Sequence, residues 1–314
     1  MQRKCQQRKS KPELSTSTFN ISLVTYVVAS DFGSGARTNL EQDSTPTETA
    51  AASRRLPAAP LLVGLILIIV CAYSQYVIPD LTFIPAVLLV YGIPIIVTGI
   101  IWVIWGWEIV TKAFRQTLKA VKFGLGYFGA FTALSIIAGV IIIFLLSVFN
   151  PSAVSLLNKP NPVLQVSPGV AWLLVAVSFL ITGPAEEYIF RGFVFGGLLS
   201  FFRNRHWLTL ALVSSIFFAA AHLYYAVVYQ VASLVQFVQL VAFGMAMAAT
   251  YYVSGGNLAA PALIHGAFDA TAFIGVAATG TIGDALREFM ILIGIIVAIV
   301  IFAERRMNKN PGSS

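Results

Sequence analysis

Ionisable side chains interrupt three apolar segments in the second half of the chain. These side chains are Glu186, Glu187, Arg191, His222, His265 and Asp269. A charged side chain inside an apolar helix is costly unless it is paired, so such residues usually mark function. Apolar residues would pack a bundle at lower cost, and the six together therefore indicate a functional site.

Helical spacing predicts two contacts among these residues and gives Glu186 no partner within its own helix. Glu187 and Arg191 are four residues apart, and so are His265 and Asp269, so each pair shares one face of a helix. Glu186 points about 100° away from its neighbour. It has no obvious partner within its own helix, and we expect its partners to come from other segments.

The residue types are suited to hydrolysis by an activated water molecule. A buried carboxylate that acts together with an imidazole can hold and deprotonate a water. A second imidazole and a protonated acid can stabilise the oxyanion that forms when this water attacks a carbonyl. No Ser or Cys stands beside a base as an obvious nucleophile, which favours the water.

Helices in a membrane must position these residues. Hydrophobic residues make up 58% of the 314 residues and charged residues 11%, with a mean hydropathy of +0.83. A soluble domain carries about 25% charged residues. The net charge of +7 comes from basic residues at the ends of apolar runs, where they set orientation and meet anionic headgroups. The composition argues against a soluble protein and against nucleic acid as a partner.

Apolar runs of membrane-spanning length recur from Leu61 onward, since about 30 Å of hydrocarbon requires about 20 apolar residues. We predict eight spans, at about 60–78, 82–107, 124–149, 169–202, 207–229, 231–254, 257–278 and 286–303. Each must be helical, because lipid cannot satisfy exposed backbone groups. Pro94 and Pro184 are expected to kink the second and fourth spans. The predicted fold is an all-α polytopic membrane protein, a bundle of about eight transmembrane helices with a polar catalytic cavity inside.

Basic clusters between the predicted spans give the orientation. Their members are Arg54, Arg55, Lys112, Arg115, Lys119, Lys122, Arg203, Arg205, Arg305, Arg306 and Lys309. All of these residues lie on one side of the membrane when the number of spans is even. The loops on the other side are poor in Lys and Arg, and only Lys159 and Arg287 depart from this pattern. Because cytoplasmic loops carry the excess of Lys and Arg, we expect a multi-pass cell membrane protein with both termini in the cytoplasm.

Composition divides the chain into three parts. Residues 1–56 are polar and basic and are expected to be disordered, because they cannot bury enough apolar surface. Residues 57–306 form the predicted membrane domain, and 307–314 the predicted cytoplasmic tail. Cys5 and Cys71 belong to no Cys/His cluster, so neither a disulfide framework nor a thiolate zinc site is expected.

Three motifs follow one another on successive late spans. They are Glu-Glu-x-x-x-Arg from Glu186, Phe-x-x-x-His ending at His222, and His-x-x-x-Asp from His265. In this order they resemble the CPBP (ABI) family of intramembrane glutamic peptidases. That family includes the type II CAAX prenyl endopeptidases and bacteriocin self-protection proteins. The resemblance covers about residues 170–275.

The resemblance implies an endopeptidase whose residues have distinct roles. Glu186 would be the general base, and His222 would help it to position the water. His265 and Asp269 would form the oxyanion site, supported by the paired Glu and Arg of the first motif. The implied substrate is a peptide or protein, and CAAX enzymes remove the last three residues after a prenylated cysteine. The lipid would enter sideways from the bilayer between helices.

Asp269 departs from the pattern of the CAAX enzymes, which commonly have Asn there. An Asn donates hydrogen bonds at any pH, whereas an Asp must be protonated to do so. A second reading is that Glu186, His222, His265 and Asp269 ligate a zinc ion, since two His and a carboxylate make a plausible shell. The chain has no His-Glu-x-x-His motif, and we expect no cofactor.

Two other classes of function remain open. One is a non-catalytic membrane adaptor or bacteriocin-immunity-type protein of the same fold. The other is a proton-coupled transporter, for which paired carboxylates and His are also suitable. Against the transporter, the two halves of the chain show no inverted repeat.

Overall fold

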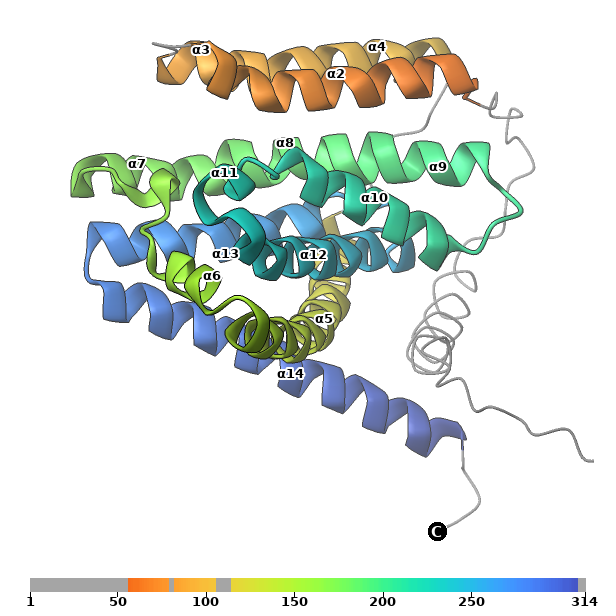
Figure 1. Cartoon of the computed structure of the whole chain (residues 1–314). Coiled ribbons are helices and arrows are strands. Elements are labelled where there is room, and N and C mark those ends of the chain that lie inside the picture. The colour runs from red at the N-terminus through yellow and green to blue at the C-terminus, as the bar shows by residue number, and fades with distance from the viewer. Residues whose placement is uncertain (1–55, 79–81, 106–113, 310–314) are drawn as a thin grey trace, which may run out of the picture.

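The computed structural model describes residues 56–78, 82–105 and 114–309, and every regular element in these ranges is helical (Figure 1). This confirms the predicted all-α class. The predicted N-terminal segment lies outside the described residues except for Leu56, and the predicted tail is described only as far as Lys309.

The α-helices follow one another with short connections. They are α2 (Ala58–Val77), α3 (Phe83–Val87), α4 (Ile93–Trp105), α5 (Phe114–Phe149), α6 (Pro151–Ser155), α7 (Pro168–Val177), α8 (Gly183–Glu187), α9 (Gly196–Phe201), α10 (Trp207–Ala221), α11 (Tyr225–Tyr229), α12 (Ser233–Val253), α13 (Ala259–Ala277) and α14 (Gly280–Lys309). Three π-helical segments join consecutive α-helices end to end, at Leu88–Gly92, Ser178–Thr182 and Tyr188–Phe195. Short 3₁₀ turns lie at Leu156–Asn158, Pro162–Leu164 and Gln230–Ala232.

Six helical segments among the described residues are long and apolar enough to cross a membrane. They are Phe83–Trp105, Thr117–Phe149, Pro168–Phe201, Tyr225–Val253, Ala259–Ala277 and Gly280–Arg306. Two shorter apolar helices, Ala58–Ser74 and Trp207–Ala221, account for the other two predicted spans. The chain is therefore a polytopic membrane protein, and each predicted span falls on an apolar helix.

The predicted span 207–229 is not one continuous helix. Its α10 ends at Ala221, and His222 leaves the helical conformation with φ −105° and ψ 10°. The 15 residues of α10 rise about 22 Å, less than the about 30 Å of a hydrocarbon core. The prediction of one continuous span over residues 207–229 was wrong. A helix can break within a membrane where other parts of the protein surround the backbone, and the local sequence does not reveal those surroundings.

Each of the two prolines expected to kink a span follows a π-helical turn. The N–H of Ile93, just before Pro94, bonds to the carbonyl of Leu88 five residues back. The N–H of Gly183, just before Pro184, bonds in the same way to Ser178. A proline removes one N–H and crowds the carbonyl four residues earlier, and the wider turn accommodates both effects without ending the helix.

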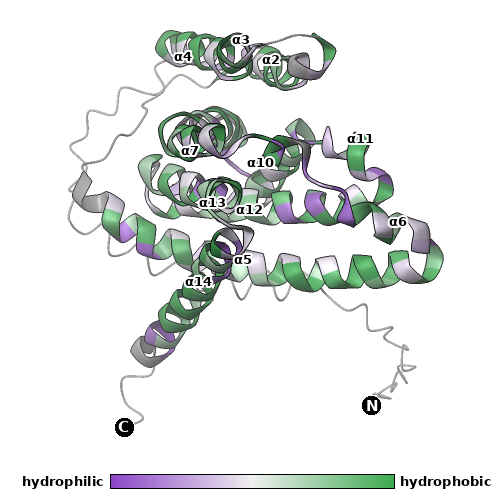
Figure 2. Ribbon diagram, turned by 90° about the vertical axis from the view of Figure 1, so that its left-hand side faces the viewer, coloured by the Kyte–Doolittle hydropathy of each residue, from purple (hydrophilic) through white to green (hydrophobic). Residues whose placement is uncertain are grey.

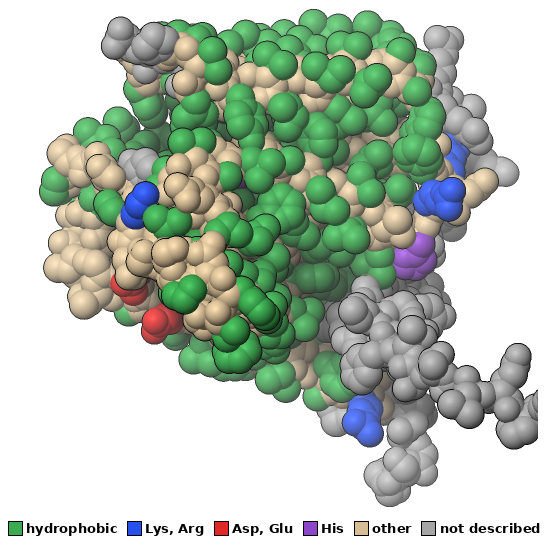
Figure 3. Space-filling model, viewed as in Figure 1, with side chains coloured by type: hydrophobic (Ala, Val, Ile, Leu, Met, Phe, Trp, Pro, Cys, Tyr) green, Lys and Arg blue, Asp and Glu red, His purple; other side chains and the backbone are tan. Residues whose placement is uncertain are grey.

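The helices stack in layers (Figures 1 and 2). The hairpin of α2, α3 and α4 covers one side of the long helix formed by α7, α8 and α9. Beneath that helix lie α10, α12 and α13, and α5 and α14 close the far side. Figure 3 shows apolar side chains over most of one face, with charged side chains toward its ends. Large apolar residues such as Val103 and Val227 are 83% exposed, which suits a surface in contact with lipid.

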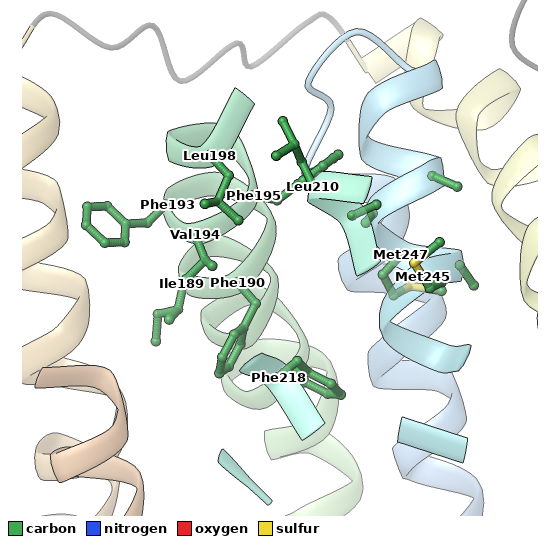
Figure 4. Close-up of a cluster of buried hydrophobic side chains, with 14 of the residues drawn as sticks. Ile189, Phe190, Phe193, Val194, Phe195, Leu198, Leu210, Phe218, Met245 and Met247 are labelled. Carbon is green, nitrogen blue, oxygen red and sulfur yellow. The ribbon is translucent and has the colours of Figure 1, made fainter. Parts of the chain in front are cut away.

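The core lies between the long helix and the layer beneath it. Figure 4 shows buried side chains from both, which are Ile189, Phe190, Phe193, Val194, Phe195, Leu198, Leu210, Phe218, Met245 and Met247. All residues from Ile189 to Phe195 are buried, on every side of that π-helix. This packing fixes the segment that directly follows Glu186 and Glu187.

Close backbone contact between α5 and α14 gives a test of the fold. A Cβ atom on Gly129 would overlap the backbone of Gly294 and Ile295, whereas one on Gly169 of α7 would meet nothing within 4 Å. We expect Gly129→Ala to destabilise the purified protein by about 1–3 kcal/mol through overpacking.

The matched change Gly169→Ala should leave the melting temperature in detergent unchanged or raise it slightly, because alanine favours helix. Equal melting temperatures for the two variants would contradict the packing of α5 on α14.

Candidate active site

The structure brings the six predicted site residues together inside the helix bundle. They come from four neighbouring elements: Glu186 and Glu187 of α8, Arg191 of the π-helix that follows it, His222 at the end of α10, and His265 and Asp269 of α13. Both α13 and the π-helix Tyr188–Phe195 contact α8, and α10 contacts the π-helix. Their proximity is a structural finding, while their chemical roles remain predictions.

Glu187 is the fully buried centre of the cluster. Its Oε2 lies 3.1 Å from Arg191 Nε, and its Oε1 lies 2.7 Å from His265 Nδ1. The guanidinium also donates from Nη2 to the carbonyl of Gly244 at 3.4 Å and lies 4.6 Å from the centre of the Phe218 ring. The contact predicted between Glu187 and Arg191 is present, and it links α8 to α10, α12 and α13.

Glu186 faces the imidazoles of two other helices. Its Oε2 lies 3.9 Å from Nε2 of His222 and 3.7 Å from Nε2 of His265. This oxygen is buried and accepts no hydrogen bond within the described part of the chain. The partners expected from other segments are therefore found, at distances longer than a direct hydrogen bond.

Neighbouring acceptors determine where the imidazole protons lie. Nδ1 of His222 is 2.9 Å from the carbonyl oxygen of Phe218, which can only accept, so this nitrogen carries a proton. Nδ1 of His265 likewise donates to the Glu187 carboxylate. In a neutral His222 the remaining Nε2 is therefore an acceptor that points toward Glu186.

Exposure rises in one direction across the cluster. The side chains of Glu187 and Arg191 are 0% and 1% exposed, and that of Glu186 is 9% exposed. His222 reaches 19% and Asp269 reaches 31%. The cluster is thus most accessible on the side of His222 and Asp269, and the ion pair forms its closed base.

Close contact between α13 and the long helix places His265 beside the glutamates. A Cβ on Gly266 would lie 2.7 Å from the carbonyl oxygen of Ser178 and 3.0 Å from Cα of Phe179, so only glycine permits this approach. Phe243 of α12 packs edge-on against the His265 ring, with centroids 4.8 Å apart. Asp269, one turn further along α13, lies with Oδ2 3.4 Å from His265 Nε2.

Tyr91 is a site residue that no sequence motif indicated. Its hydroxyl donates to Oε1 of Glu186 at 2.9 Å. The residue lies on the π-helical turn Leu88–Gly92, in the hairpin that covers the long helix. The available signal was a tyrosine hydroxyl within an apolar run, three residues before Pro94. Neither feature identifies a partner 95 residues away.

A small, open depression lies next to His222. It is bounded by the end of α10, by α11 and by the start of α12, and its polar lining includes Ser233 and Gln236. Its walls are otherwise mainly apolar.

The arrangement of the His, Asp and Glu donors bears on whether the cluster can hold a metal ion. Among the described residues, no three His, Cys, Asp or Glu side chains are arranged to hold one. The contact of His265 Nδ1 with Glu187 is one that metal-bound histidines also make, and it leaves Nε2 facing the cluster.

Residues 168–271 match the family model described as type II CAAX prenyl endopeptidase Rce1-like. No curated protein and no solved structure matches the chain. The matched segment runs from α7 into α13 and contains all six predicted site residues. The resemblance to the CPBP family inferred from the three motifs is confirmed over this segment.

Proposed function

We propose that the chain is an intramembrane endopeptidase that hydrolyses a peptide bond with a water molecule activated by Glu186. The observation that carries the proposal is the buried Oε2 of Glu186, which faces the Nε2 atoms of His222 and His265. The match to the Rce1-like family model independently supports the general class, a CAAX-type protease that acts within a membrane.

The hydrogen-bonding capacity of Glu186 and His222 supports water activation. Oε2 of the ionised carboxylate and Nε2 of the neutral imidazole are both acceptors, 3.9 Å apart. One water molecule can donate to both, because it has two O–H groups. Glu186 would take a proton from this water as its oxygen attacks the carbonyl carbon, and would pass the proton to the leaving amine when the C–N bond breaks.

His265 and Asp269 are proposed to stabilise the oxyanion. The imidazole lies between the two carboxylates, 3.7 Å from Glu186 and 3.4 Å from Asp269. Donors that already point to where negative charge develops lower the barrier, because they need no reorganisation. Because Nδ1 of His265 already donates to Glu187, its Nε2 would donate to the oxyanion in the doubly protonated imidazolium form. Asp269 can donate only when protonated, so it would act in its neutral form.

A peptide or protein substrate suits the open side of the site. A peptide chain can approach beside His222 and Asp269, which are the most exposed side chains of the cluster. The bilayer is the proposed source of the substrate, because the surrounding helices expose large apolar side chains. We propose a prenylated C-terminal tail as the first substrate to test, and removal of its last three residues as the reaction.

The described members of the basic clusters gather at one end of the bundle. Lys122 of α5 pairs with Glu304 of α14 at 3.5 Å, and Asn257 donates to Thr117 near the start of α5 at 3.0 Å. Trp207, two residues after Arg205, stacks on Tyr252 with ring centroids 4.7 Å apart. Because Tyr252 lies near the end of α12, just before Asn257, this contact brings Arg203 and Arg205 to the same end of the bundle. We propose that this end lies in the cytoplasm, with both termini.

Loss of the proposed base or of its histidine should abolish cleavage. We expect Glu186→Gln and His222→Gln to lower kcat by about 100-fold to 10,000-fold, since each removes a proton-transfer or water-positioning group. The measurement is cleavage of a panel of prenylated and unprenylated tail peptides by the purified protein in detergent.

Matched controls are Glu288→Gln and His206→Gln, because both of these residues are exposed. They should cleave at the rate of the unchanged protein. Full activity of Glu186→Gln would refute the peptidase. Co-purification of a partner protein that survives this change, without cleavage of any peptide, would point to the adaptor.

A chelator distinguishes hydrolysis by a metal-free Glu186 from hydrolysis by a zinc ion bound to the same side chains. Because we propose that Glu186 activates water without a metal ion, phenanthroline and EDTA should leave the cleavage rate unchanged. A loss of activity that added zinc restores would contradict this and favour the metal shell of Glu186, His222, His265 and Asp269.

Arg191 should act through stability and not through contact with substrate. Arg191→Met leaves Glu187 buried without its cationic partner, and breaking a buried pair costs about 3–5 kcal/mol. We therefore expect a much lower melting temperature in detergent. Arg287→Met, at a half-exposed pair with Asp284, should change it little. Equal melting temperatures would contradict the proposed supporting role.

A further inference from the structure

We propose that Tyr91 is a positioning residue for Glu186, so that the N-terminal hairpin of α2, α3 and α4 completes the active site. The inference rests on the proposed function, and it extends the site beyond the segment 168–271 that matches the family model. Tyr91 would not touch the substrate and would act through the orientation of the carboxylate.

The hydrogen bond from Tyr91 gives the two carboxylate oxygens of Glu186 different surroundings. Oε1 of Glu186 accepts from the Tyr91 hydroxyl at 2.9 Å, while Oε2 faces the two imidazoles. The terminal torsion of a glutamate is broad, so an unrestrained carboxylate would rotate. One fixed oxygen stops that rotation and directs the other toward the position proposed for the water.

The backbone that carries Tyr91 is itself unusual. The residue lies within the π-helical turn that precedes Pro94, and π-turns inside α-helices are frequent at functional sites. The aromatic ring packs against the main hydrophobic core, which restricts the position of the hydroxyl.

Other contacts dock the same hairpin onto the elements that carry the site. Tyr188, next to Glu187, donates to the carbonyl of Ile95 at 3.4 Å and meets Trp102 edge-on at 4.7 Å. Tyr73 of α2 donates to the carbonyl of Ala220 at 2.8 Å, two residues before His222. The hairpin therefore touches the helix of the glutamates and the end of α10 (Figure 1).

The kinetic test is Tyr91→Phe, which removes one hydroxyl and keeps the ring. We expect kcat to fall about tenfold, the rate equivalent of about 1.4 kcal/mol, with KM changed less than about twofold. The matched control Tyr188→Phe removes another hydroxyl from the same interface, one that bonds to Ile95 instead of Glu186, and should retain kcat. Equal kcat values for Tyr91→Phe and the unchanged protein would overturn the positioning role, as would a rise in KM alone.

A second measurement needs no activity. We expect Tyr91→Phe to lower the melting temperature in detergent when Glu186 is present, because Oε1 then loses its only donor in the described structure. In a Glu186→Leu background the same change should be neutral or stabilising, because both partners are then apolar. Equal shifts in the two backgrounds would overturn the contact.

The two measurements also separate this inference from the proposed function. If the unchanged protein cleaves no peptide of the panel, the peptidase fails, and the melting temperatures still decide whether Tyr91 holds Glu186. Coupled melting temperatures together with a selective loss of kcat support both.

Discussion

The buried ion pair of Glu187 and Arg191 is the constraint on which the rest of the site depends. Neither side chain is more than 1% exposed, and a buried ion pair needs further hydrogen bonds to offset the cost of removing its charges from water. His265 of α13 and the carbonyl of Gly244 in α12 form two such hydrogen bonds with the pair. The pair therefore fixes four elements relative to one another, and a change in any of them would leave a buried charge without compensation.

This constraint separates the chemistry of two adjacent carboxylates. Because Glu187 is held at the closed base, the helical turn points Glu186 away from it and toward His222. The oxygens of Glu187 lie 3.1 Å from Arg191 Nε and 2.7 Å from His265 Nδ1, whereas Oε2 of Glu186 lies 3.9 Å from His222 Nε2 and 3.7 Å from His265 Nε2. Such a pair in unequal environments is the usual basis for one structural and one reactive carboxylate.

Local spacing made much of this arrangement predictable. The contacts of Glu187 with Arg191 and of His265 with Asp269 follow from a four-residue separation on one helix face, and the length of the apolar runs indicated each membrane helix. Contacts between distant segments were not predictable, because periodicity carries no information about partners. Tyr91 was missed for this reason.

The break after α10 was missed for a related reason, and it bears on function. Backbone that leaves the regular α-helical pattern inside a membrane is tolerated only where protein or a cavity surrounds it. The chain departs from regular helix at His222 and in the π-turns that flank α8 and carry Tyr91. All of these departures adjoin one buried carboxylate, Glu186. These irregular segments lie where they aim side chains at Glu186, as expected when geometry at the site outweighs the cost to the helices.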